Sequence, residues 1–147
     1  MARTEPPRAL EHIQSLPSWL AGRVAARGRS LVAEAIAEEG LKLPHHAVLA
    51  AVSEYGPVAQ ADLVRRLSID AKDVVLLLNH LEEAGLAVRE PDSGDRRKNA
   101  VTVTPTGIHT LERCAKLAEQ ANAELLAPLD TAERQQLIAL LTRVYEA

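Results

Sequence analysis

The spacing of hydrophobic residues changes abruptly at Gly85, and this change constrains the fold more than any other feature of the chain. Before it, residues 71–84 carry apolar side chains at i, i+3, i+4 and i+7, the spacing of a helix with one buried face. After it, residues 86–90 and 101–104 alternate as strands do, on either side of the turn-rich, charged segment 91–99. The residues of the helical stripe are Val74, Leu77, Leu78 and Leu81. The pattern predicts a helix followed by a β-hairpin in which Leu86, Val88 and Glu90 alternate along the first strand.

Helices are predicted on both sides of this segment, because Leu and Ala make up 47 of the 147 residues and both favour helix over strand. Residues 1–14 are expected to form a mobile arm or an irregular lead-in. Helical spacing then begins near residue 17 and ends at Gly40, with exposed apolar stripes on the terminal helices. The other predicted helices start near Pro44, Gln60, Pro105 and Thr131. Thr104 is the predicted N-cap of the helix at Pro105, and Asp130 with Glu133 predicts a capping box at the last helix. The fold class is therefore mainly α with a small two- or three-stranded antiparallel wing.

Composition limits the classes of protein that the chain can belong to. A net charge of −3 argues against a uniformly basic surface but leaves room for a local basic patch. One cysteine excludes an internal disulfide framework and a CxxC site. No stretch approaches 18 apolar residues, and no signal-peptide core is present at the N-terminus. We expect a soluble, cytoplasmic protein that is not bound to a membrane.

The order of helix, short turn, helix and hairpin with a basic tip is that of a winged helix-turn-helix. A helix that follows such a turn fits the major groove of DNA, and its N-terminal residues contact base edges. A cationic hairpin suits the neighbouring phosphates or the minor groove. The pattern predicts double-stranded DNA as the partner.

Residues 92–107, DSGDRRKNAVTVTPTG, resemble the wing signature of the MarR (multiple antibiotic resistance regulator) family, which reads D-x-x-D-R-R, an alternating strand and L-T-x-x-G. The resemblance implies a homodimeric transcriptional regulator, expected to act as a repressor at a palindromic site and to be released by a small-molecule effector. It also implies four segments. These are an N-terminal arm (1–15), an N-terminal dimerisation helix (16–43), a winged helix-turn-helix flanked by dimerisation helices (44–104), and C-terminal dimerisation helices (105–147).

The same resemblance assigns roles in the wing. Arg97 matches the arginine that enters the minor groove, and Asp95 matches the acidic residue that orients it. Arg96 and Lys98 are its cationic neighbours, and Asn99 completes the predicted DNA-contacting tip. The alternative is a solvated hairpin tip whose charges bind nothing.

The predicted recognition helix, residues 71–84, departs from the family's usual pattern. Residues 56–104 contain seven Lys and Arg and eight Asp and Glu, and the resulting net charge of −1 is unfavourable for DNA binding. Asp70 and Asp73 are interpreted as helix caps rather than base readers. Ser68 and Lys72 are predicted to contact DNA. Arg65 and Arg66 either contact phosphates from the preceding helix or face water.

The sequence gives weaker indications about an effector pocket, a metal site and a reactive thiol. The resemblance implies an effector pocket near the dimerisation helices, and the candidate lining residues are Trp19, Arg23, His46 and Tyr55. Trp19 supplies a flat apolar surface and Arg23 suits an anionic ligand, although interface packing is the alternative for Trp19. No HxxxH or HExxH spacing occurs, so neither a metal site nor a cofactor is predicted. Cys114 is expected to be buried and inert.

Two other function classes compete. An enzyme would need scattered His and carboxylate residues to converge, because no GxGxxG, P-loop, GxSxG or HExxH motif is present. A winged-helix adaptor that binds protein instead of DNA is favoured by the near-neutral lobe and by the apolar Val75 and Leu76. We predict that the protein is not an enzyme.

Overall fold

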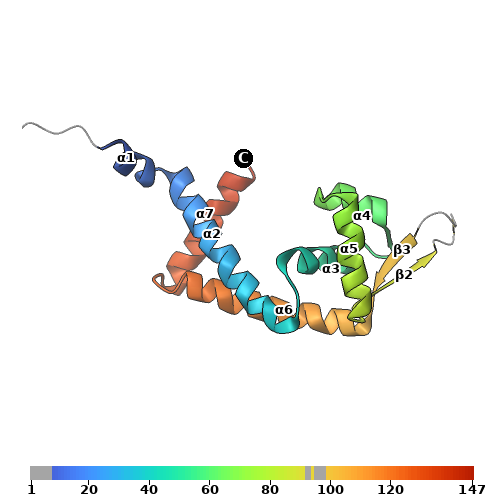
Figure 1. Ribbon diagram of the computed structural model, residues 1–147. Helices are drawn as coiled ribbons and strands as arrows, with labels where there is room; N and C mark the ends of the chain where they lie inside the picture. The colour runs from blue at the N-terminus through green and yellow to red at the C-terminus, as the bar shows by residue number, and fades with distance from the viewer. Residues whose placement is uncertain (1–7, 92–93, 95–98) are drawn as a thin grey trace, which may run out of the picture. The chain divides into compact units, whose positions relative to one another are not determined.

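The computed structural model describes residues 8–91, 94 and 99–147, with the side chain of Asn99 outside that description. The described chain divides into two units, residues 32–119 and the pair of segments 1–31 and 120–147. The elements in chain order are α1 (Ala9–Ser15), α2 (Pro17–Ile36), η1 (Ala37–Glu39), α3 (Leu43–Tyr55), β1 (Val58–Ala59), α4 (Gln60–Leu67), α5 (Ala71–Glu83), β2 (Ala87–Pro91), β3 (Asn99–Val103), α6 (Pro105–Leu125) and α7 (Thr131–Tyr145) (Figure 1). The prediction of a mainly helical winged helix-turn-helix is confirmed.

The core of the 32–119 unit forms where α3, α4 and α5 pack against one another and against the sheet. Its side chains come from the apolar faces that the helical spacing predicted, and most of them are Leu or Val. The largest fully buried members are Ile36, Leu49, Leu63, Leu78, Leu81, Val48, Val52, Val74, Val101 and Cys114. This core holds α5 by one face and leaves its other face to solvent.

The sheet has three strands in the order β1-β3-β2, and both pairings are antiparallel. Val58 lies opposite Val101, and Ala87 lies opposite Val103. The short strand β1 escapes sequence analysis because two residues are too few to establish an alternation.

The strand β2 presents the opposite face from the one that the Leu86–Val88–Glu90 alternation suggests. Ala87 is buried and Arg89 is half-buried, whereas Val88 is 40% exposed. Leu86 belongs to the turn that ends α5, where its N–H donates to the Leu81 carbonyl at 2.8 Å. Because Leu86 is used in this helix-ending contact, the strand's inward set begins one residue later, and a one-residue shift exchanges the two faces.

A tight junction joins the end of α5 to the start of α6. Gly85 adopts a left-handed conformation (φ 73°), as a glycine that ends a helix commonly does. The Thr104 hydroxyl donates to the Gly85 carbonyl at 2.6 Å and accepts from the Gly107 N–H at 3.0 Å. The predicted N-cap at Thr104 is confirmed, and the same hydroxyl ties α6 to the turn that ends α5.

The second unit contains α1, α7 and parts of α2 and α6. For residues 1–14 the alternative of an irregular lead-in is wrong from residue 9 onward, where α1 begins; Ala, Leu and Glu at its start are good helix formers. The predicted capping box at the start of α7 is confirmed, because Asp130 and Glu133 each accept a hydrogen bond from the other's backbone N–H. None of the described helices is both long enough and apolar enough to cross a membrane.

Candidate nucleic-acid interface

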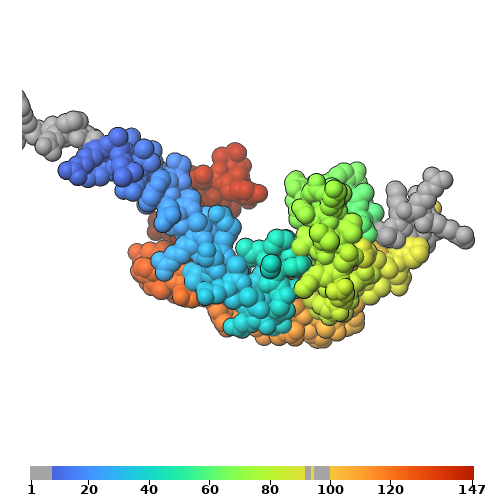
Figure 2. All heavy atoms as spheres, viewed as in Figure 1, coloured from blue at the N-terminus to red at the C-terminus, as the bar shows by residue number. Residues whose placement is uncertain are grey.

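The helix α4, the turn 68–70 and the helix α5 form the helix-turn-helix. Ser68 ends α4 in a left-handed conformation (φ 52°), which redirects the chain toward α5. The Asp70 carboxylate then accepts from the Lys72 N–H at 2.8 Å and caps α5, as predicted. Figure 2 shows α5 lying at the surface of this unit. The turn therefore presents a capped helix whose first turns are open to a partner.

The outward face of α5 contains one cation. Lys72 is exposed and is the single Lys or Arg of the helix. Val75 is 38% exposed and Leu76 is 65% exposed, so apolar side chains accompany it. Asp73 lies in the first turn, where a carboxylate complements the helix dipole.

The two arginines of α4 are both exposed, and each has a partner. Arg65 pairs with Asp62 one turn earlier on the same helix. The Arg66 guanidinium lies over the Tyr55 ring, 4.1 Å from its centroid, in a cation–π contact. Tyr55, a predicted pocket residue, is thus in contact with Arg66, and its role toward a ligand stays a prediction.

The predicted wing residues Asp95, Arg96, Arg97 and Lys98 lie outside the described residues. The backbone of Asn99 lies opposite Pro91 in the β2–β3 ladder. The loop that carries these residues therefore leaves and rejoins the sheet at the same end of the β2–β3 hairpin. Their roles remain predictions.

Arg89 fixes the hairpin to α5, and sequence analysis missed it. Its guanidinium donates to the Glu82 carboxylate at 2.7 and 3.0 Å and also to the Asn79 side-chain oxygen, while its backbone N–H donates to Glu82 at 3.0 Å. The hydrogen bonds from Arg89 hold the pKa of Glu82 below its ordinary value. An arginine at an inward position of a short strand is the sequence signal that indicates such an anchor.

Two histidines join α3 to α5. The rings of His45 and His80 lie 4.2 Å apart, and the His45 Nδ1 accepts from the Lys42 N–H at 3.2 Å. Burial lowers the pKa of His45, and the nearby His80 and Lys42 lower it further. Burial also lowers the pKa of His46. Both imidazoles on α3 therefore favour the neutral form.

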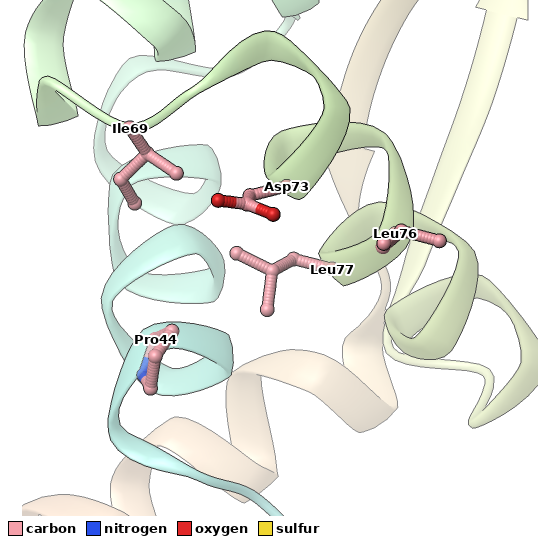
Figure 3. Close-up of a pocket in the computed structure, with 5 residues that line it drawn as sticks. All are labelled: Pro44, Ile69, Asp73, Leu76 and Leu77. Atoms are coloured by element: carbon pink, nitrogen blue, oxygen red, sulfur yellow. The ribbon is translucent and has the colours of Figure 1, made fainter.

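A pocket of about 390 Å³ lies between the start of α3 and the start of α5. It is lined by Pro44, Ile69, Asp73, Leu76 and Leu77. Figure 3 shows that Leu77 extends between Ile69 and Pro44, whereas Leu76 points away from Pro44. The walls are mainly apolar, and the Asp73 carboxylate makes the pocket unfavourable for an anion.

The four predicted effector residues are divided between the two units, two in each. In one unit, the Arg23 guanidinium lies 5.9 Å from the centre of the Trp19 ring. In the other, His46 lies in the first turn of α3 and Tyr55 is its last residue, about 14 Å apart along the helix axis. The structure therefore brings together Trp19 and Arg23 but separates His46 from Tyr55.

Cys114 is fully buried in the core of the 32–119 unit, as predicted. Burial raises the pKa of its thiol, so the reactive thiolate is disfavoured. Within the described residues, no three His, Cys, Asp or Glu side chains gather in a way that could hold a metal ion.

Comparison with known proteins agrees with this geometry. A family model described as MarR family matches residues 39–98. A putative transcriptional regulatory protein for the hcr operon of Thauera aromatica is 32% identical over 107 residues, which is 73% of this chain and 64% of that protein. For the first two curated relatives, the chain spans slightly less than two thirds of their length (64% and 63%).

Solved structures extend the similarity over most of the chain. The MarR family protein Rv2887 of Mycobacterium tuberculosis, in complex with p-aminosalicylic acid, has a TM-score of 0.73 and 25% identity, covering 88% of this chain and 98% of its own. BpsR of Bordetella bronchiseptica, whose DNA binding is regulated by 6-hydroxynicotinic acid, has a TM-score of 0.72 and 26% identity, covering 97% and 99%. The wing motif, the helix-turn-helix and these likenesses agree: the chain belongs to the MarR family.

Proposed function

We propose that this protein is a homodimeric transcriptional repressor that binds a palindromic DNA site in the cytoplasm through α5 and the loop between β2 and β3, with no catalytic activity. One observation carries the proposal: the capped, exposed helix α5 is tied to the hairpin through Arg89 and Glu82. Because the Arg89 side chain and backbone both donate to the half-buried Glu82 carboxylate, helix and wing meet DNA as one body.

Phosphate contacts are assigned to the cationic and polar groups around α5. Lys72 is exposed at its start, and the contact between Arg66 and Tyr55 orders a guanidinium nearby on α4. Neutralising phosphates in this way releases counterions and makes binding depend steeply on salt. The residues proposed to contact DNA are Arg65, Arg66, Ser68, Lys72, Arg96, Arg97, Lys98 and Asn99, with Asp95 orienting Arg97.

Dimerisation is assigned to segments 16–43 and 105–147. The unit that contains α1 and α7 exposes large apolar side chains, which a monomer leaves in contact with water. They include Leu10, Ile13, Leu16, Leu20, Val24, Ile138, Leu140, Leu141, Val144 and Tyr145. A second copy of the chain is the partner that such surfaces favour in a two-fold symmetric regulator. Sedimentation velocity at micromolar concentration should give the mass of a dimer, and a monomer mass would contradict this assignment.

The effector is proposed to be a small aromatic carboxylic acid. Two MarR-like neighbours are associated with p-aminosalicylic acid and 6-hydroxynicotinic acid. Trp19 and Arg23, in contact with each other, supply an aromatic face and a cation for such a molecule. His46 and Tyr55 remain secondary candidates.

Trp19 is the chain's single tryptophan, so its fluorescence reports on this site alone. We expect salicylate or 6-hydroxynicotinate to change the emission of the wild-type protein, and the change to be lost in Arg23→Ala. An unchanged emission with both acids would refute the assignment of these two residues.

The DNA-binding proposal is tested by a salt titration with random-sequence duplex DNA. We expect affinity to fall steeply with salt, and Arg97→Ala to lower the slope by about 0.9 for each phosphate contact that is lost. Arg8→Ala, just before α1, is the matched control and should leave the slope unchanged.

A protein-binding adaptor is the second candidate, because residues 56–104 carry a net charge of −1 and Val75 and Leu76 are exposed. It predicts no detectable binding of the wild-type protein to duplex DNA even at low salt. That result would replace the repressor proposal with the adaptor.

A further inference from the structure

The base-reading end of α5 presents aliphatic side chains. In a helix-turn-helix, the N-terminal residues of the second helix contact base edges. In the first two turns of α5, the large exposed side chains are Lys72, Asp73, Val75 and Leu76. Leu76 is 65% exposed, and Figure 3 shows it pointing away from Pro44 and the neighbouring helix α3.

The polar groups near this end of the helix are poorly placed for bidentate base recognition. The Asp70 carboxylate is occupied by the Lys72 N–H. Arg89, the first arginine after α5 in the sequence, is held by Asn79 and Glu82 in the C-terminal half of the helix, away from this end. Lys72 is therefore the one cation that α5 itself offers to a base or a phosphate.

An aliphatic side chain in the major groove has a specific complement. Among the groups that base pairs display there, the 5-methyl group of thymine is the apolar one. Bringing it against an exposed leucine or valine removes both surfaces from water, which is favourable in proportion to the area buried.

We propose that Val75 and Leu76 read thymine methyl groups, so that the DNA half-site is recognised largely through apolar contact at these positions. The inference rests on the proposed function and specifies which base the DNA-binding helix recognises. It requires at least one thymine at a fixed position opposite the start of α5.

The test compares thymine with deoxyuridine, which pairs identically but lacks the methyl group. Duplexes that bind the full-length wild-type protein are selected from a random library, and each thymine in the bound site is then replaced by deoxyuridine. We expect the dissociation constant to rise about fourfold for each methyl group contacted. Leu76→Ala should remove most of this dependence at one thymine position, and Val75→Ala at a neighbouring one. Val88→Ala, which truncates an exposed aliphatic residue of β2, is the matched control and should keep the wild-type dependence.

Both α5 substitutions shorten exposed side chains, so the variants should fold, and circular dichroism verifies this. Equal affinity of the wild-type protein for thymine and deoxyuridine duplexes would overturn the inference and leave DNA binding intact. The same thymine dependence in Leu76→Ala, Val75→Ala and wild type would overturn the assignment to these residues. Failure to bind any selected duplex would instead refute the proposed function itself, and the inference with it.

Discussion

Replacing Gly107 by alanine tests whether the junction between α5 and α6 has the close packing described above. Gly107 lies in the first turn of α6. A Cβ atom at this position would lie 2.8 Å from the Val103 Cγ2 and closer still to the Leu86 carbonyl oxygen. Because backbone atoms cannot move aside as a flexible side chain does, α6 would have to shift away from the turn after α5.

The expected cost follows from the hydrogen bonds that such a shift would break. Thr104 makes three hydrogen bonds at this junction, with the Gly85 carbonyl, the Leu86 carbonyl and the Gly107 N–H. At about 1 kcal/mol each, their loss would cost about 3 kcal/mol. Alanine's better helix propensity would return about 1 kcal/mol. The free energy of unfolding should therefore fall by about 2 kcal/mol.

Urea denaturation followed by circular dichroism measures this change, at one fixed protein concentration because dimerisation contributes to stability. With a slope near 2 kcal/mol/M, the midpoint of Gly107→Ala should fall by about 1 M. Gly22→Ala in α2 is the matched control, since a Cβ there meets no described atom within 4 Å, and it should be neutral or slightly stabilising. A Gly107→Ala variant as stable as wild type would refute the packing argument.

Three further predictions concern the residues that bind the elements of the 32–119 unit together. Arg89→Ala should lower the free energy of unfolding by about 1–3 kcal/mol in urea titrations, because Glu82 loses a charged hydrogen-bond partner, and an unchanged midpoint would contradict the anchor. Because the pKa values of His45 and His46 are lowered in the folded protein, the unfolded chain binds protons first as the pH falls below about 6.5. The free energy of unfolding should therefore decline with acidification from that point, which urea midpoints between about pH 7.5 and 5 measure. The dependence of the midpoint on pH should become weaker in the variant that carries both His45→Gln and His46→Gln. Cys114, buried with a raised thiol pKa, should react with a disulfide reagent only after unfolding, and rapid labelling of the native protein would show that its environment is misassigned.

Local sequence determined most of the elements and their ends. The helix stripe of residues 71–84, the caps at Asp70, Thr104 and Asp130, and the glycine after α5 all act through neighbours a few residues away. Such interactions are visible in the sequence because the spacing of residues in a helix sets which of them can meet. The helix-turn-helix and its hairpin could therefore be predicted, and the wing motif pointed to the family.

Contacts between distant residues were decided by the tertiary structure alone. The pairing of β1 with β3, the inward position of Arg89 and the stacking of Arg66 on Tyr55 join residues whose separation follows no local period. The face of β2 depends on whether Leu86 ends the helix or starts the strand, and the hydrogen bond to Leu81 decides it. Sequence periodicity specifies which face of an element is apolar, but only the packed fold determines which neighbour that face meets, because packing depends on the shape of the whole core.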